Sequence, residues 1–248
     1  MDYRKFTKKQ LADILDIIHA SVSCRGEKQM EGLLDSIGSL VSGDFSVCGI
    51  GKGDAKGLSE TPKVINGSYP WEWLKIYGER ELYYNDPIIW HNFQYPGAQL
   101  WDQTYELFSG KISRDFISMS RDFGLCGGVS GGLFDKGTGL STIFTFSGKE
   151  KAFDGHQKEI MSVLSPHLHQ ALVRVYKETV NVRCSLSGRE KEVMCWIREG
   201  KTNWEISMIL NISERTVKFH VQNIERKLNA VNKTHAVAIA LDQNLLTS

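Results

Sequence analysis

The chain has 248 residues, a net charge of +1 and a hydrophobic content of 41%, which suits one or two globular domains with a sizeable core. Its five cysteines are odd in number and include no Cys-x-x-Cys pair, which argues against a disulfide framework or a zinc site. No apolar run suits a signal peptide or a membrane span, so we expect a cytoplasmic protein that acts without a membrane.

The first part of the chain alternates between helical and strand patterns. Thr7 and Gln10 have capping-box spacing ahead of a helix whose apolar face runs to Val22. Pro70 suits the first turn of a helix, where its missing N–H costs nothing. The expected elements, in chain order, are helices at 8–22 and 30–40, strands at 44–50 and 63–66, a helix at 70–81, a long irregular stretch at 86–101, a helix at 113–124, strands at 125–134 and 139–146, and a long helix through 160–175.

This order of elements indicates an α+β domain in which an antiparallel sheet is sandwiched by helices. Pro166 lies inside the last helical pattern and should kink it. We place this domain at residues 1–176, a polar linker without a helical stripe at 177–185, and a small all-α domain at 186–248.

The last part of the chain predicts three short helices separated by turns. Ser187 and Glu190 have capping-box spacing, Gly200 suits the end of a helix, and Thr202 or Asn203 can cap the next one. The second helix should bury Ile206, Ile209 and Leu210, and the third, capped by Ser213 after a turn at Asn211, should bury Val217, Val221, Ile224 and Leu228.

The third of these helices, from Ser213 to Leu228, is basic on the faces that its apolar stripe leaves free. Its cations suit phosphate contacts, and an amide such as Gln222 can pair with base edges. Residues 181–248 carry a net charge of +3 and residues 1–180 a net charge of −2, which agrees with nucleic-acid binding by one end. Two helices joined by a short turn, the second one basic, form a helix-turn-helix arrangement; a solvated basic face on a small bundle is the alternative.

The strings LSxRExEV, GKTNxEI, ISERTVKxHVxNI and KLN resemble the C-terminal DNA-binding domain of the LuxR family. The resemblance implies that the third helix enters the major groove of double-stranded DNA and that the last helix forms a homodimer over a two-fold site. We expect Lys218, Phe219 and Gln222 on the base side. The remaining candidates are Arg215, Arg226 and Lys227 at phosphates, with Thr202, Asn203, Thr216 and Asn223 beside them.

Tyr69, Trp73 and Tyr77 fall at i, i+4 and i+8, on one face of the predicted helix. An aromatic stripe that packs the core is the plain interpretation. A pocket is the alternative, because the hydroxyl of Tyr69, the N–H of Trp73 and the carboxylate of Asp86 all need partners when buried. A ligand that offers an amide N–H and two carbonyls, one of them in an ester or lactone, would satisfy all three groups.

Tyr69-Pro70-x-x-Trp73-x-x-x-Tyr77, then Asp86-Pro87 and Trp101, resembles the autoinducer-binding domain of LuxR-type quorum-sensing receptors, which bind N-acyl-homoserine lactones. The resemblance implies that Trp73 meets the lactone carbonyl, Asp86 the amide N–H and Tyr69 the acyl carbonyl, with no cofactor or metal. The residues that would line the rest of the site are Tyr77 and Trp101, with Gly128 on the strand floor.

One residue departs from this pattern and leaves the ligand open. The position two after the Asp is often Thr or Ser in the family, and here it is Ile88, which offers no side-chain hydrogen bond. A regulator of the same family that responds to a small molecule other than a homoserine lactone is therefore the main alternative. A phosphorylation-controlled response regulator is a weaker one, because no parallel βαβ repeat precedes the last domain.

An enzyme is not indicated. His167 and His169 are two apart in a helix and face different directions, which does not suit a metal pair. Gly128-Val129-Ser130-Gly131-Gly132 has the letters of a hydrolase Gly-x-Ser-x-Gly motif but continues as a strand instead of turning into a helix. We interpret this stretch as a strand whose missing side chains make room for a ligand or a packed helix.

Overall fold

The computed structural model describes residues 5–54, 57–149, 153–183, 186–242 and 245–246. By its internal contacts the chain divides into two compact units, Met1–Tyr176 and Lys177–Ser248, and each is described by itself.

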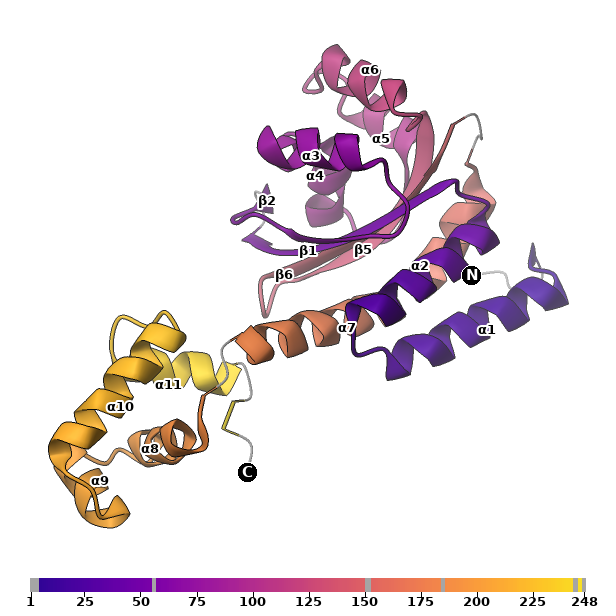
Figure 1. Ribbon diagram of the computed structural model, residues 1–248. Coiled ribbons are helices and arrows are strands. Elements are labelled where there is room, and N and C mark those ends of the chain that lie inside the picture. Colours follow the sequence, from indigo (N-terminus) through magenta and orange to yellow (C-terminus); the bar gives the residue numbers. More distant parts are fainter. Residues whose placement is uncertain (1–4, 55–56, 150–152, 184–185, 243–244, 247–248) are drawn as a thin grey trace. The chain divides into compact units, whose positions relative to one another are not determined.

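The first unit is built on one antiparallel sheet (Figure 1). Its strands are β1 (Phe45–Asp54), β2 (Gly57–Leu58), β3 (Lys63–Asn66), β4 (Gln99–Leu100), β5 (Gly127–Asp135) and β6 (Leu140–Gly148). The order across the sheet is β2-β1-β6-β5-β4, and β3 also pairs with β1. Every described pair is antiparallel, which confirms the α+β fold class expected from the order of elements.

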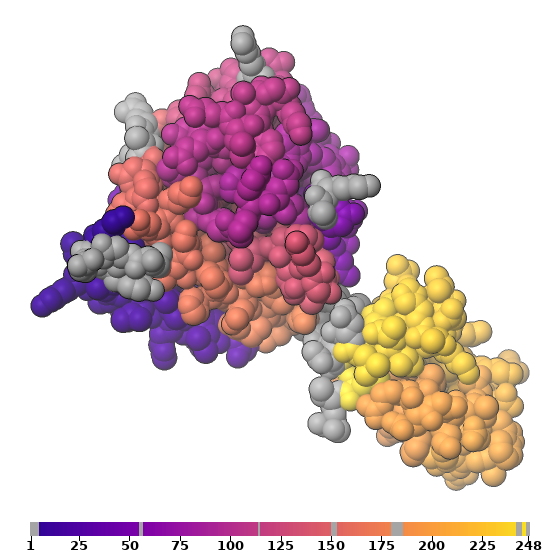
Figure 2. Space-filling model, turned by 180° about the vertical axis from the view of Figure 1, so that it is seen from behind, coloured from indigo at the N-terminus to yellow at the C-terminus, as the bar shows by residue number. Residues whose placement is uncertain are grey.

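On one face of the sheet lie α2 (Glu27–Val41) and α7 (Gly155–Arg183), and α1 (Lys8–Ser23) packs against these two helices (Figure 1). Phe144 and Phe146 of β6 are fully buried on this side, with Ile37 of α2 and Leu164 of α7 in the same core. Because side chains alternate along a strand, Thr145, which lies between them, faces the other way. On the surface seen from behind, indigo α1 and salmon α7 lie side by side (Figure 2).

The helices on the opposite face are α3 (Trp71–Glu79), α4 (Pro87–Gln94), α5 (Trp101–Leu107) and α6 (Arg114–Asp122), with a 3-10 turn at Leu82–Tyr84 (Figure 1). The prediction of an irregular stretch at 86–101 is therefore wrong, because α4 and β4 lie within these residues. Asp86 caps α4 through its side chain and Pro87 occupies the first turn. An eight-residue helix is too short to show the 3.6-residue apolar period on which the prediction relied.

The last helix of the sheet domain is longer than expected. Pro166 lies inside α7, and the helix continues past it to Arg183. Residues 177–183, expected to belong to a linker without a helical stripe, are the end of this helix, whereas 184–185 lie outside the described residues.

The second unit consists of α8 (Gly188–Arg198), α9 (Asn203–Leu210), α10 (Glu214–Lys227) and α11 (Lys233–Asp242). Capping boxes begin α8 at Ser187 and α9 at Thr202, and Ser213 caps α10, as the sequence predicts. Gly200 has a φ of 79° after α8, in the left-handed region that glycine enters at little cost. Ile206, Val217 and Ile224 are buried in one small core. Ile209 is not part of it, since 44% of its surface is exposed.

Candidate functional site

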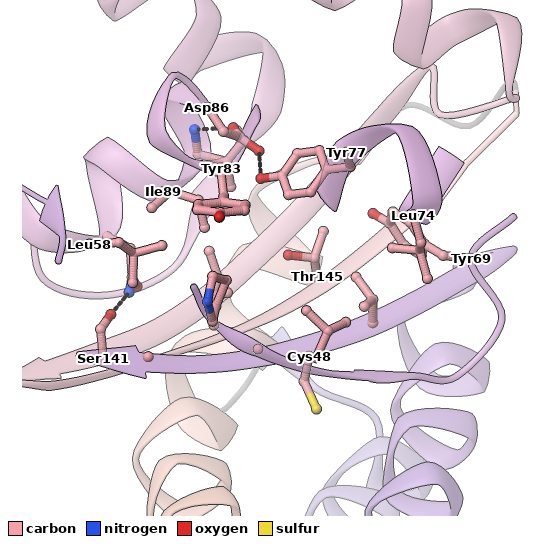
Figure 3. Close-up of a pocket in the computed structure, with 18 of the residues that line it drawn as sticks. Cys48, Leu58, Tyr69, Leu74, Tyr77, Tyr83, Asp86, Ile89, Ser141 and Thr145 are labelled. Atoms are coloured by element: carbon pink, nitrogen blue, oxygen red, sulfur yellow. Dashed lines mark hydrogen bonds between the residues drawn. The ribbon is translucent and has the colours of Figure 1, made fainter. Parts of the chain in front are cut away.

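A cavity of about 110 Å³ lies between the sheet and the helices α3 to α6 (Figure 3). Its walls are mainly apolar and aromatic, with a few polar groups, which is the usual character of a small-molecule site. Six of the seven predicted ligand-binding residues line it, namely Tyr69, Trp73, Tyr77, Asp86, Ile88 and Trp101. The helical spacing thus places an aromatic stripe on a cavity wall and not only in a core.

Trp73 is the centre of the aromatic wall. Only 4% of its surface is exposed, and its ring centroid lies 5.7 Å from that of Tyr77, one helical turn further along α3. Phe123 and Phe116 pack against the same indole at 5.7 Å and 6.1 Å. These contacts fix the ring, so that an indole N–H exposed to the cavity would present a donor in a defined direction.

Asp86 is a buried carboxylate that two donors hold in place. Its Oδ2 accepts a hydrogen bond of 2.7 Å from the Tyr77 hydroxyl, and its Oδ1 accepts one of 2.8 Å from the backbone N–H of Ile88. Burial raises the pKa of Asp86 to about 6, although both hydrogen bonds act in the opposite direction. Each oxygen has a second lone pair, so the ionised group can still accept a bond from a ligand.

Tyr69 brings an unused hydroxyl to the pocket. Its backbone N–H donates 2.8 Å to Oδ1 of Asn66, which fixes the chain where α3 begins. Its own hydroxyl and that of Ser147 are buried without a hydrogen-bond partner among the described residues. Burial raises the pKa of Tyr69 well above the usual value, so the group is a neutral donor. Buried polar groups rarely remain unpaired, which makes this hydroxyl a candidate for a ligand contact.

Gly128 lies behind Trp101, which is part of the pocket wall. It is not among the lining residues, but a Cβ at this position would lie 2.7 Å from Cε2 of Trp101 and 2.7 Å from the carbonyl oxygen of Phe146. The missing side chain therefore lets the Trp101 ring approach the backbone of β5 closely. That ring is also tied by its N–H, which donates 2.9 Å to the Ser130 hydroxyl.

Several polar residues of the pocket region were missed by the sequence analysis. Ser130 also exchanges a 3.0 Å hydrogen bond with Thr145, its partner across β5 and β6. Asn92 of α4 donates 2.9 Å to the hydroxyl of Ser141 on β6. Gln99 donates 2.9 Å to the carbonyl oxygen of Ile88. These pairs join residues that are 11 to 49 positions apart and lie on different elements, so no helical or strand spacing predicts them.

The second unit presents its basic helix to solvent. Arg215, Lys218, Phe219, Gln222 and Arg226 of α10 are exposed, and 58% of the Phe219 surface is accessible. The outer face of α10 therefore carries cations, an amide and an aromatic ring, as base and phosphate contacts require. Thr216 and Asn223, at the edge of this face, are half-buried.

Lys227 differs from the other candidate phosphate contacts. Its ammonium lies 2.7 Å from Oε2 of Glu190, whose side chain is 5% exposed. Burial alone would raise the pKa of Glu190, but the hydrogen bonds from Lys227 and Ser187 lower it below the usual value. The pair therefore holds α10 against the capping box of α8. Thr202 caps α9, and Oδ1 of Asn203 is buried without a partner among the described residues.

Comparison with known protein families decides what these two units are. A model of the autoinducer binding domain matches residues 40–172, and a model of bacterial regulatory proteins of the luxR family matches residues 184–240. The chain belongs to the LuxR family. It is an autoinducer-binding transcription regulator with a helix-turn-helix DNA-binding domain, and it is not an enzyme. The resemblance stated from the motifs is confirmed.

Individual LuxR-family proteins agree with this assignment. The transcriptional activator EchR of Dickeya chrysanthemi is 32% identical over 200 residues, covering 75% of this chain and 80% of that protein. The activator LuxR of Aliivibrio fischeri is 26% identical, covering 91% of each chain. A crystal structure of Escherichia coli SdiA matches with a TM-score of 0.62 and 26% identity, covering 96% of this chain and 99% of that one. Within the described residues, none of the helices has the length and apolar content of a bilayer-crossing segment.

Proposed function

We propose that this LuxR-family regulator binds an N-acyl-homoserine lactone in the α3–α4 pocket and, as a homodimer in the cytoplasm, a two-fold site on double-stranded DNA. The observation that carries the ligand proposal is the grouping of Trp73, Asp86 and the unpartnered hydroxyl of Tyr69 on one small cavity. Two donors and one acceptor among aromatic walls match two carbonyls and an amide N–H.

The polarity of each group decides which ligand atom it meets. Asp86, when ionised, has no proton to give and accepts from the amide N–H. The indole of Trp73 only donates, and we assign it the lactone carbonyl. The hydroxyl of Tyr69 makes no hydrogen bond to a described residue, and we assign it the acyl carbonyl. The acyl chain then extends over the apolar floor, past Ile88.

Ligand binding would act on the regulator through stability. A ligand that binds only the folded state stabilises it by about 2.7 kcal/mol at a hundred times its dissociation constant. Pairing the hydroxyl of Tyr69 removes an unpaired buried donor, which otherwise costs about 1–3 kcal/mol. We infer that the bound form is the population that dimerises and occupies DNA.

On DNA we place α10 in the major groove. Lys218, Phe219 and Gln222 point away from the domain core and would meet base edges, whereas Arg215 and Arg226 would meet phosphates. Lys227 is engaged by Glu190, so its contribution to DNA would be secondary to holding α10. A dimer would read two half-sites about 34–36 Å apart, one turn of the duplex.

A second ligand class has its own support. Ile88 lines the pocket but adds no side-chain hydrogen bond. A structure of SdiA in complex with octanoyl-rac-glycerol matches this chain with a TM-score of 0.61 and 25% identity, covering 98% and 99% of the two chains. An acyl glycerol has an ester carbonyl and hydroxyls but no amide N–H, so Asp86 would accept from a hydroxyl instead.

Thermal melting of the full chain separates the two classes. Acyl-homoserine lactones of graded chain length are compared with octanoyl-glycerol at equal concentrations. The proposal expects the melting temperature to rise with one range of lactone chain lengths. A rise with octanoyl-glycerol alone would select the second class, and a rise with neither would contradict both.

A further inference from the structure

A second polar cluster lies in the pocket, away from Trp73 and Asp86. Asn92 of α4 and Ser141 of β6 both line the cavity, and 6% and 5% of their surfaces are exposed. Nδ2 of Asn92 donates 2.9 Å to the hydroxyl oxygen of Ser141 and 3.1 Å to the carbonyl oxygen of Thr142. Figure 3 places Ser141 at the end of the pocket near Leu58, whereas Tyr69 lies at the opposite end.

This cluster has hydrogen-bonding capacity left over. Both N–H groups of Asn92 are used, but Oδ1 receives no hydrogen bond from a described residue. The oxygen of Ser141 accepts from Asn92, while the hydroxyl hydrogen has no acceptor among the described residues. The cluster therefore offers one acceptor and one donor to whatever occupies this end of the cavity.

The spacing along the elements separates this cluster from the head-group contacts. Asn92 follows Asp86 by six positions in α4, which corresponds to roughly 9 Å along the helix axis. Ser141 precedes Thr145, which hydrogen-bonds Ser130 beside Trp101, by four positions in β6, and this corresponds to roughly 13 Å along the strand. The rest of the lining is mainly apolar and aromatic and includes Ile88.

We propose that Asn92 and Ser141 select a ligand whose acyl chain carries a hydroxyl group at its far end. The inference rests on the proposed function, because it takes the lactone head group to lie at Asp86. A hydroxyl donates to Oδ1 of Asn92 and accepts from Ser141 at once, so it uses both free positions. A plain alkyl end satisfies neither and desolvates both, which disfavours the unsubstituted chain.

The alternative is a purely structural pair. The bonds from Asn92 to Ser141 and Thr142 also tie α4 to β6, and a helix anchor needs no ligand. The two roles differ in what they predict for ligand preference. An anchor changes the stability of the protein and the binding of all ligands alike, whereas a recognition pair changes the ratio between two ligands that differ in one oxygen.

The test uses the full chain and pairs of acyl-homoserine lactones of equal length, with and without a terminal hydroxyl, measured by calorimetric titration. The wild type should bind the hydroxylated member about tenfold more tightly at the matching length. Ser141→Ala should reduce that ratio to near one, and Asn92→Leu should reverse it. Ser120→Ala is the matched control, because Ser120 also lines the pocket but donates 2.9 Å within its own helix, to Ile117.

The outcomes are distinct. Equal binding of both members by the wild type at every length would overturn the inference and leave the lactone pocket standing. A preference that Ser141→Ala leaves intact would also overturn it, even if Asn92→Leu fails to fold. Absence of binding by every lactone, hydroxylated or plain, would overturn the proposed function and this inference with it.

Discussion

The hydroxyl of Tyr77 donates a hydrogen bond of 2.7 Å to Oδ2 of Asp86. The two residues lie on different elements, α3 and the start of α4, and the bond joins the aromatic wall to the acceptor of the pocket. Tyr77 is therefore a positioning residue for the carboxylate as well as a wall of the cavity.

Replacing Tyr77 by Phe keeps the ring and removes this donor. We expect Tyr77→Phe to weaken lactone binding by about 3- to 10-fold, which is less than the roughly 1.5–3 kcal/mol that a hydrogen bond to a charged group is worth, because the bond positions the carboxylate and does not itself contact the ligand. The pKa of Asp86 should rise further, because the bond from Tyr77 lowers it. Titrations at several pH values measure both effects. Unchanged affinity and an unchanged pH midpoint would show that Tyr77 only packs.

Ligand affinity should depend on pH through Asp86, whose pKa burial raises to about 6. An amide N–H is accepted by the ionised carboxylate, so binding should weaken as pH falls below this value. We expect about tenfold weaker binding at pH 5 than at pH 7.5. The same titrations with Asp86→Asn should lose this dependence, and a wild type that binds equally at both pH values would contradict the assignment.

The contribution of Asp86 to the stability of the ligand-free protein should fall as pH rises, whereas ligand affinity should increase. The folded-state pKa of Asp86, about 6, is above its ordinary value of 3.8, so the unfolded chain releases the proton first as pH rises. This group therefore favours the folded state below about pH 4, and its contribution is lost as pH rises to about 6. Urea unfolding of wild type and Asp86→Asn across this window measures the difference, which should be absent in the variant.

Substitution by alanine should change the stability of the sheet domain differently at two glycines on the pocket side of the sheet. A Cβ at Gly128 meets Trp101 at 2.7 Å, whereas a Cβ at Gly49 has its nearest neighbours at 3.7 Å and 3.8 Å. We expect Gly128→Ala to destabilise the sheet domain by about 1–3 kcal/mol, and Gly49→Ala to cost little stability. Denaturant unfolding compares them, and equal losses would refute the role given to Gly128.

Gly49→Ala also tests how much of the cavity the acyl chain occupies, because Gly49 lines the cavity. The added methyl group should shorten the acyl chain that binds best without moving the head group. Affinities across a chain-length series measure this shift. A uniform loss at all lengths would mean that the methyl group disturbs the fold and not the volume.

The parts of the pocket that follow local spacing are predictable from the sequence, and those that follow strand pairing are not. Trp73 and Tyr77 share a face because they are four apart on one helix. Ser130 meets Thr145 only because β5 and β6 pair in that register. The position of Asn92 was not predictable for a second reason: it lies on an eight-residue helix, which is too short to show a helical apolar period.

The caps of the DNA-binding unit were also predictable, because each depends on residues three apart. The exposure of Ile209 was not predictable. Helical spacing places an apolar residue on a face of its helix, but it does not show whether another helix covers that position. The engagement of Lys227 by Glu190 spans α8 and α10 and needed the packed structure.

On DNA, two variants of α10 should separate base contacts from phosphate contacts. We expect Gln222→Ala to change preference among half-site sequences by about 1–3 kcal/mol at one base position. Arg226→Ala should weaken binding to all sequences alike and reduce the slope of affinity against salt by about one. Binding assays on a randomised half-site at several salt concentrations measure both, and an identical pattern for the two variants would contradict the division.

The central claim is that Asp86 accepts the amide N–H of the ligand, and the most direct test replaces that N–H group by oxygen. Titrations compare an acyl-homoserine lactone with its ester analogue, in which oxygen replaces the amide N–H, on the wild type and on Asp86→Asn. If Asp86 accepts that N–H, the wild type should bind the ester at least about tenfold more weakly. The variant, whose amide can donate to the ester oxygen and still cap α4, should discriminate much less. Equal affinity of the wild type for the two ligands would contradict the account.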